Sequence, residues 1–200
     1  MAMPWPGNSD RVFSEAGCER AVAVLDWIKG CPSDYLLADA FKKSADMIVS
    51  QIEAGQIREH PDAYFFPVTY LYRHAVELEI KQLVRHGIRL GILRESCKLR
   101  KLLNKHELDP LWKEVERVLL HVWPDGNIDD IQNVRRMIQE FHNIDPTGQN
   151  LRYFRTRSGD STTDGLPRTV DLVNLKNTCE GLFNFFDGCD AGLSEAEQGP

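Results

Sequence analysis

The sequence has 200 residues, of which 42% are hydrophobic and 27% charged, and this composition is typical of a folded globular chain rather than a disordered one. Its formal net charge is −6 at pH 7, whereas proteins that coat long stretches of duplex carry a basic surplus, because phosphate neutralisation supplies most of their affinity. A general nucleic-acid coat protein is therefore not expected, but a small basic site for a few nucleotides is compatible with this charge.

The sequence contains few of the residue patterns that indicate a metal or cofactor site. The cysteines are scattered and form no C-x-x-C pair, which predicts reduced thiols rather than a disulfide framework or a zinc site: Cys18, Cys31, Cys97, Cys179 and Cys189. No two histidines have the spacing of a helical or finger-type metal motif, and no Gly-rich phosphate loop is present. We expect no metal and no cofactor.

The N-terminal residues lack a basic stretch followed by an apolar core, so they do not resemble a signal peptide. No apolar run has the length needed to span a bilayer. These two features predict a cytoplasmic protein, in a bacterial setting, with no membrane partner.

The first half of the chain predicts an irregular segment followed by three helices. Pro4, Pro6 and Gly7 indicate irregular structure over residues 1–12. Helical patterns follow over residues 14–30 and 33–55, and the second has one hydrophobic face formed by Leu37, Phe41, Ala45, Ile48 and Ile52. A third helix begins between Pro61 and Pro67 and ends near Gly87, and its wide apolar surface predicts a central position.

The second half predicts a short basic helix within residues 88–105, then three longer helices. The fourth helix follows His106 and ends before Pro124, and the fifth is capped by Asn127. The buried face of the fifth helix is predicted to consist of Ile131, Val134, Ile138 and Phe141. Residues 143–168 are predicted to be irregular, with a short extended piece at 151–154. The last helix is expected over residues 169–187, with Leu172, Leu175, Cys179, Leu182, Phe183 and Phe186 facing inward.

Residues 188–200 are small or acidic and predict a flexible C-terminal tail. Long helices with short connections favour an all-α bundle of about five to six helices, with an irregular loop before the last one. The expected organisation is therefore one helical domain over residues 13–187, between the irregular start and the tail.

A polar stripe interrupts the apolar surface of the third helix. Arg73, Glu77 and Lys81 are spaced i, i+4 and i+8, and His74 lies beside them, so all four side chains project to neighbouring parts of one face. One interpretation is a salt-bridge ladder that supports the helix. The other is a functional site in which Glu77 orients His74 or Arg73 for work on an anionic group.

A second constellation lies at the carboxyl end of the fifth helix. Arg136 and His142 have the spacing Arg, five residues, His, and Asp145, Arg152 and Arg155 come directly after them. Arginine holds phosphate with two parallel hydrogen bonds and histidine titrates near neutrality, so the pair suits cleavage of a phosphodiester beside a 2′-hydroxyl. Alternatively, His142 interacts with the helix dipole and Asp145 folds back to Arg152 to hold the loop.

The third segment is HELDPLW, residues 106–112, which we interpret as a helix start whose apolar residues Leu108, Leu111 and Trp112 pack in the core. Together with RHAVELEIK and FHNIDPTGQNLRY, this segment resembles a group of uncharacterised bacterial proteins with a HEPN-like helical bundle, over roughly residues 60–187.

The resemblance implies a dimer-forming helical bundle. Many HEPN domains are ribonucleases of defence or toxin systems with an Arg, four to six residues, His motif, and others are non-catalytic modules that bind nucleotides or partners. Arg136 and His142 have the allowed spacing, but Met137 stands where the family prefers a polar residue, and Arg73–His74 has no second His.

Two functions follow as expectations. The first is a non-catalytic module of bacterial defence, stress or toxin–antitoxin type that binds a nucleotide or a partner protein encoded nearby. The alternative is a metal-independent RNA endonuclease that acts as a homodimer, with Arg136 and His142 as catalytic residues and Arg73, His74 and Glu77 as second choices. Residues expected to contribute to binding are Lys81, His106, Asp145, Arg152, Tyr153 and Arg155.

Overall fold

A computed structural model describes residues 34–57, 60–156 and 158–198, together with Ala23. The chain divides into two units, Met1–Pro32 and Ser33–Pro200, and the second unit is described here. The predicted irregular segment 1–12 and the predicted helix over residues 14–30 lie outside the described residues. Within the described part of the chain, six α-helices and no strand are present, which confirms the all-α prediction.

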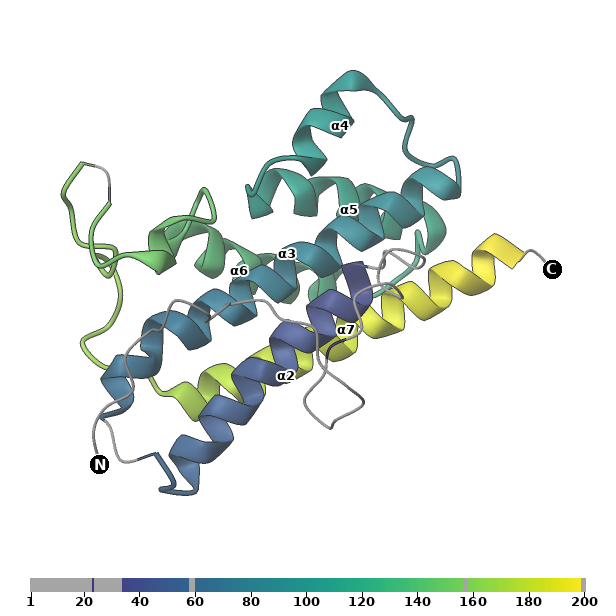
Figure 1. Ribbon diagram of the computed structural model, residues 1–200. Coiled ribbons are helices and arrows are strands. Elements are labelled where there is room, and N and C mark those ends of the chain that lie inside the picture. The colour runs from purple at the N-terminus through teal and green to yellow at the C-terminus, as the bar shows by residue number, and fades with distance from the viewer. Residues whose placement is uncertain (1–22, 24–33, 58–59, 157, 199–200) are drawn as a thin grey trace. The chain divides into compact units, whose positions relative to one another are not determined.

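The predicted helices of this unit are present in the predicted order, and the elements are α2 (Asp34–Glu53), η1 (Pro61–Tyr64), α3 (Phe65–Arg89), α4 (Cys97–Leu103), α5 (Leu108–Val122), α6 (Ile128–Ile144), η2 (Asn150–Arg152) and α7 (Leu172–Gln198). Helix α3 is central in this unit, because it packs against α2, α5 and α7 (Figure 1). Helix α6 packs against α5. The predicted extended piece at 151–154 is instead the end of a 3₁₀ turn, η2, followed by an isolated bridge between Arg155 and Ser161.

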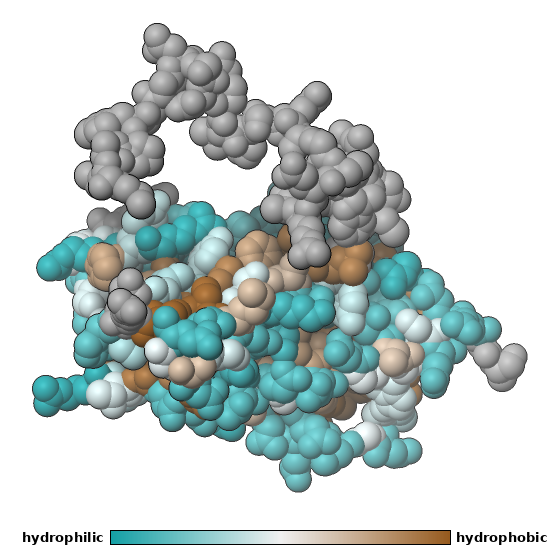
Figure 2. All heavy atoms as spheres, turned by 60° about the horizontal axis from the view of Figure 1, so that its bottom comes forward, coloured by the Kyte–Doolittle hydropathy of each residue, from teal (hydrophilic) through white to brown (hydrophobic). Residues whose placement is uncertain are grey.

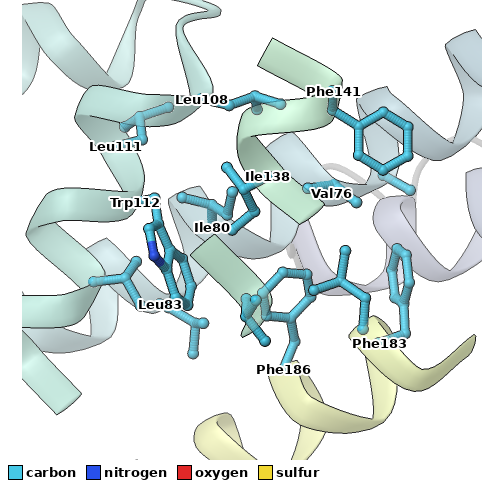
Figure 3. Close-up of a cluster of buried hydrophobic side chains, with 14 of the residues drawn as sticks. Val76, Ile80, Leu83, Leu108, Leu111, Trp112, Ile138, Phe141, Phe183 and Phe186 are labelled. Atoms are coloured by element: carbon cyan, nitrogen blue, oxygen red, sulfur yellow. The ribbon is translucent and has the colours of Figure 1, made fainter. Parts of the chain in front are cut away.

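The hydrophobic core lies where these helices meet α3. Figure 3 shows side chains from α3, α5, α6 and α7 pointing into one cluster: Val76, Ile80, Leu83, Leu108, Leu111, Trp112, Ile138, Phe141, Phe183 and Phe186. All of the residues predicted for the buried face of α6 are buried, as are Leu108, Leu111 and Trp112. Burial of each such side chain contributes about 1.5–3 kcal/mol, so this cluster is the main stabilising element of the unit.

Two helices begin at a residue whose side chain caps the first turn: Asn127 for α6 and Ser96 for α4. The side chain of Asn127 accepts a hydrogen bond from the main-chain N–H of Asp129 at 3.1 Å, as predicted for α6. Ser96 accepts one from the N–H of Leu99 at 3.2 Å and thereby starts α4. Such caps satisfy main-chain donors that a helix leaves unpaired at its first turn.

Helix α2 packs on the bundle mainly with the predicted face, since Ala45 is buried and Phe41, Ile48 and Ile52 pack against the core. Ala38, Ala45 and Val49 are its buried residues, whereas Leu37 is 48% exposed. The small alanine side chains allow α2 to approach α3 closely, and this places the larger residues of the predicted face at the edge of the contact. Leu37 is the member of the predicted face that lies outside the contact.

The predicted C-terminal tail is wrong for residues 188–198, because α7 continues to Gln198. Cys189 and Leu193 extend the buried face that Phe186 begins, and both are buried. The ring nitrogens of His86 lie 3.0 Å from Asp190 and 3.1 Å from Glu197, which attaches the last turns of α7 to α3. The residues that suggested a tail therefore belong to a docked helix, with Asp190 and Glu197 on the side that contacts α3.

Hydrophilic side chains cover most of the face that carries α2 and α7, around a strip of hydrophobic ones (Figure 2). None of the described helices combines the length and the apolar character that crossing a membrane requires.

Candidate functional site

The polar stripe of α3 is a buried network of charges. Nη1 of Arg73 donates to Oε2 of Glu77 at 2.6 Å, and Nζ of Lys81 donates to Oε1 of Glu77 at 2.7 Å. The side chains of Arg73 and Glu77 are each 1% exposed, and that of Lys81 is 9% exposed. The predicted ladder therefore exists, but it lies inside the protein, where an ion that loses its partner is strongly unfavourable.

His106, at the start of α5, completes this network from the opposite side. Its Nδ1 lies 2.8 Å from Oε1 of Glu77, and its main-chain oxygen accepts a hydrogen bond from Nη2 of Arg73. Burial alone would raise the pKa of Glu77, but the hydrogen bonds from Lys81 and His106 and the charge of Arg73 hold that pKa below its ordinary value. Glu77 is therefore a stable anion that fixes the orientation of His106, whose side chain is half exposed.

Asp145 connects the network to the loop that follows α6. Its main-chain oxygen accepts hydrogen bonds from Nε and Nη2 of Arg73, at 3.3 and 3.2 Å. Its Oδ1 accepts the main-chain N–H groups of Gln149 at 2.8 Å and Asn150 at 2.9 Å, and Oδ2 lies 3.5 Å from Nε of Arg73. Asp145 is fully buried and does not pair with Arg152, so the predicted Asp145–Arg152 contact is wrong.

Gly148 fits the turn into the space beside the network. Its φ of +73° is a conformation that L side chains rarely adopt, and a Cβ here would lie 2.9 Å from Cβ of His106 and 3.3 Å from Nη1 of Arg73. The turn after Asp145 is thus held both by hydrogen bonds and by close packing. Leu151, only 2% exposed, anchors its far end.

The residues directly after this anchor project outward. We call residues 152–155, Arg-Tyr-Phe-Arg, the RYFR loop; all four are exposed, with Tyr153 at 66% and Phe154 at 78%. Its backbone is nevertheless fixed: Thr162 donates its hydroxyl to the oxygen of Tyr153 at 2.9 Å and its N–H to the oxygen of Phe154 at 3.3 Å. An exposed pair of aromatic residues on a held backbone is a pattern that binding sites use.

A stack of rings joins the RYFR loop to α3. The guanidinium of Arg152 lies over the ring of Tyr70 at 5.2 Å, and Tyr70 stacks on His74 with centroids 5.9 Å apart. His74 also meets Phe41 of α2 edge to face at 4.6 Å, and its burial lowers its pKa. His74 is therefore a neutral packing residue, and it is Arg73, not His74, that Glu77 holds.

An open hollow of about 880 Å³ lies beside the RYFR loop. Tyr153 and Arg155 line it together with polar residues from both sides of the loop, among them Thr147, Asn150 and Ser158. Arg155 donates to the oxygen of Gly159 at 2.9 Å, which leaves its other guanidinium N–H groups near the hollow. An aromatic face, a guanidinium and several hydrogen-bonding groups thus surround one concave surface.

Arg136 and His142, the predicted catalytic pair, do not lie together as the residues around the hollow do. Arg136 is exposed on α6 and pairs with Glu140 at 2.9 Å. His142 is half-buried, and its Nδ1 is enclosed without a hydrogen-bond partner. On an α-helix their spacing corresponds to about 120° around the axis, so the two side chains do not share a face.

Several residues of this region were not singled out by the sequence. Tyr70, Phe154 and Gly148 belong to the site; the signals for them were aromatic residues next to arginines and a glycine after Asp-Pro-Thr. Glu116 accepts from Nε1 of Trp112 at 2.7 Å and from Nε of Arg135 at 2.6 Å, so it joins α5 to α6. Within the described residues, no group of three or more His, Cys, Asp or Glu side chains is arranged to hold a metal ion.

Comparison of the chain with protein-family models, with curated proteins and with solved structures gave no match.

Proposed function

We propose that this chain is a non-catalytic, HEPN-like module that binds a nucleotide or a short single-stranded RNA at the RYFR loop. Its setting would be a bacterial, cytoplasmic defence, stress or toxin–antitoxin system, in which it acts as a homodimer alongside a protein partner encoded nearby. The observation that carries the proposal is the exposure of two aromatic and two basic side chains on a loop that is fixed from below by a buried charge network.

Base stacking supplies the first part of the expected affinity. Exposed Tyr153 and Phe154 each offer a ring face, and stacking of one base on an aromatic side chain contributes about 1–3 kcal/mol. Phe154 is supported from behind by Phe66, with ring centroids 5.0 Å apart. A supported ring loses little conformational entropy when a base stacks on it, which favours binding.

The arginines supply the second part. Arg155 and Tyr153 line the same hollow, and guanidinium groups bind phosphate oxygens in pairs. With a net charge of −6, the chain has no basic surplus with which to cover a long stretch of phosphate backbone. Few phosphates can therefore be neutralised at once, and the ligand is expected to be short and single-stranded rather than a duplex.

The alternative is a metal-independent RNA endonuclease that acts as a homodimer through Arg136 and His142. It has less support, because Arg136 pairs with Glu140 and the Nδ1 of His142 is enclosed. A second copy of the chain would have to supply the missing half of such a site, as in dimeric HEPN nucleases.

A binding assay tests the proposal. A fluorescein-labelled short oligoadenylate RNA is titrated with the protein in EDTA, and its anisotropy is followed while its integrity is checked on a gel. We expect saturable binding without cleavage, and about tenfold weaker binding for Tyr153→Ala and for Arg155→Ala, since each removes roughly 1.4 kcal/mol.

Arg100→Ala is the matched control, because Arg100 is an exposed arginine of α4 that pairs with Glu95. Its affinity should equal that of the wild type. No binding, or equal weakening by the control, would refute the RYFR loop as the site. Cleavage that disappears in His142→Ala and Arg136→Ala would instead favour the endonuclease.

A further inference from the structure

A small acidic pocket lies between α2, α3 and α7, on residues that the nucleotide proposal does not use. Its volume is about 200 Å³. The residues that line it include Tyr35, Asp39, Lys42, Glu79, Phe183 and Asp187. The pocket is therefore the size of a small ligand rather than of a protein segment.

Glu79 is the unusual member of this pocket. Its side chain lines the pocket and is only 1% exposed, yet within the described residues no hydrogen bond or ion pair involves its carboxyl group. Glu77, two residues earlier on the same helix and equally buried, pairs with Arg73 and Lys81 and contacts a ring nitrogen of His106. A buried carboxyl group without a partner is unfavourable, so each such group calls for an explanation.

The lysines beside Glu79 do not neutralise it. Lys43 pairs with Asp39 at 2.7 Å, and Lys42 pairs with Asp46 at 2.8 Å and with Glu180. Among the described residues, no cation pairs with Asp187, which is exposed at the pocket's edge. Within the described residues, neither lysine therefore forms an ion pair with Glu79 or Asp187.

The pocket also shows how it accommodates an alkylammonium group. Nζ of Lys42 lies 5.8 Å from the centre of the Phe183 ring while it contacts the carboxylates of Asp46 and Glu180. Carboxylates together with an aromatic face are the groups that recognise organic cations. A metal ion is disfavoured, since no described group of three His, Cys, Asp or Glu side chains is arranged to hold one.

We propose that this pocket binds a small aliphatic polyamine of the putrescine and spermidine class, with one ammonium group donating to the Glu79 carboxylate and a second one near Asp187. Consistent with an unpartnered carboxyl group, burial, with Asp187, Asp190 and Asp39 adding to it, raises the pKa of Glu79 to about 8. The proposal is independent of the RNA site, because the two sites share no residue.

Isothermal titration of spermidine into the full chain, at moderate salt and slightly alkaline pH, tests the proposal. Glu79→Gln keeps the shape of the side chain but removes its charge, and it should weaken spermidine binding by about tenfold or more, as expected for loss of a charge-assisted hydrogen bond. Glu53→Gln is the matched control: Glu53 is exposed on α2, and its substitution changes the net charge equally. Its affinity should be unchanged.

The absence of saturable spermidine binding to the wild type would overturn the proposal. Equal weakening by Glu53→Gln, or displacement of spermidine by an equal concentration of magnesium chloride, would overturn it too, because either result indicates general attraction of cations to an acidic protein. Asp187→Asn provides a second variant at an exposed position, and it should weaken binding several-fold without affecting the circular dichroism spectrum.

Discussion

Arg73 and Glu77 form an ion pair one turn apart on α3, with Nη1 and Oε2 2.6 Å apart and both side chains 1% exposed. Neither charge faces water, so each depends on the other and on Lys81, His106 and Asp145 for compensation. Arg73 also donates hydrogen bonds to the main-chain oxygen of His106, which precedes α5, and to that of Asp145, which follows α6. The pair therefore links helix packing to the position of the RYFR loop.

Replacement of Glu77 by alanine should destabilise the protein by about 3–5 kcal/mol, because it leaves Arg73 and Lys81 as buried cations. Urea unfolding followed by circular dichroism measures the change. The control is Glu140→Ala, which removes one partner of an exposed pair with Arg136 and should cost about 0–1 kcal/mol. Equal losses for the two variants would show that the buried network is not a stabilising unit.

Replacement of Asp145 by alanine should release the RYFR loop, because the N–H groups of Gln149 and Asn150 lose their acceptor. Limited trypsin digestion, with cleavage after Arg152 and Arg155 followed by mass spectrometry, reports local opening. We expect cleavage about tenfold faster, which corresponds to roughly 1.4 kcal/mol less protection. Asp130→Ala, at an exposed position of α6, should digest like the wild type; unchanged cleavage in Asp145→Ala would contradict the anchoring role.

Gly148→Ala should destabilise the protein by about 1–3 kcal/mol, since it combines an unfavourable φ of +73° with a Cβ only 2.9 Å from Cβ of His106. Gly165→Ala separates the two effects. Gly165 has a φ of +87°, but a Cβ there would meet nothing within 4 Å, so only the backbone term of about 1 kcal/mol applies. Thermal unfolding of both variants measures the difference, and a Gly148→Ala melting temperature no lower than that of Gly165→Ala would argue against close packing of the turn.

Glu79 predicts a loss of stability as the pH rises. Its pKa is about 8 in the folded chain and close to 4.5 when unfolded, so the folded state retains the proton between these values. The stability from this group is fully present below about pH 4.5, falls as the pH rises and is lost above about 8. Glu79→Gln should remove this decline, and Glu53→Gln should not.

The groups that face Glu79 must be considered in the same measurement. They are Tyr35, Asp39, Lys42 and Lys43 on α2, Glu180, Asp187 and Asp190 on α7, and His86 on α3. Glu77 has the opposite sign, because its lowered pKa makes stability fall as the pH drops below about 4.5. The difference between the urea-unfolding profiles of wild type and Glu79→Gln between pH 5 and 8 therefore reports Glu79, because His74, whose lowered pKa also affects stability in this range, is common to both proteins. Identical pH profiles for the two proteins would refute the raised pKa of Glu79.

Local features of the helices could be predicted from the sequence. The buried face of α6, the Asn127 cap and the i, i+4 spacing of Arg73, Glu77 and Lys81 depend on neighbours in the same helix, which periodicity reveals. The end of α7 could not be predicted this way. Leu193 is buried because α7 docks on the bundle, and Gly192 allows the ring of Trp123 to approach so closely that a Cβ would lie 2.7 Å from it.

The partners of the charge network depend on contacts between distant segments. His106 and Asp145 were singled out as polar residues near helix ends, but nothing in their spacing indicated that both would meet Arg73. The same holds for Glu79, which looked like one more acidic residue of α3 until α2 and α7 enclosed it. Burial decides the chemistry of these groups, and burial is a property of the packed helices.

The central claim, that the RYFR loop contacts RNA, is tested most directly by photo-cross-linking. The protein is irradiated with a short RNA that contains 4-thiouridine, digested, and the modified peptides are identified by mass spectrometry. We expect the cross-links within residues 147–158, at Tyr153 or Phe154, and their loss in Tyr153→Ala combined with Phe154→Ala. Cross-links confined to α6 around Arg136 and His142, or unaffected by the double substitution, would contradict the claim.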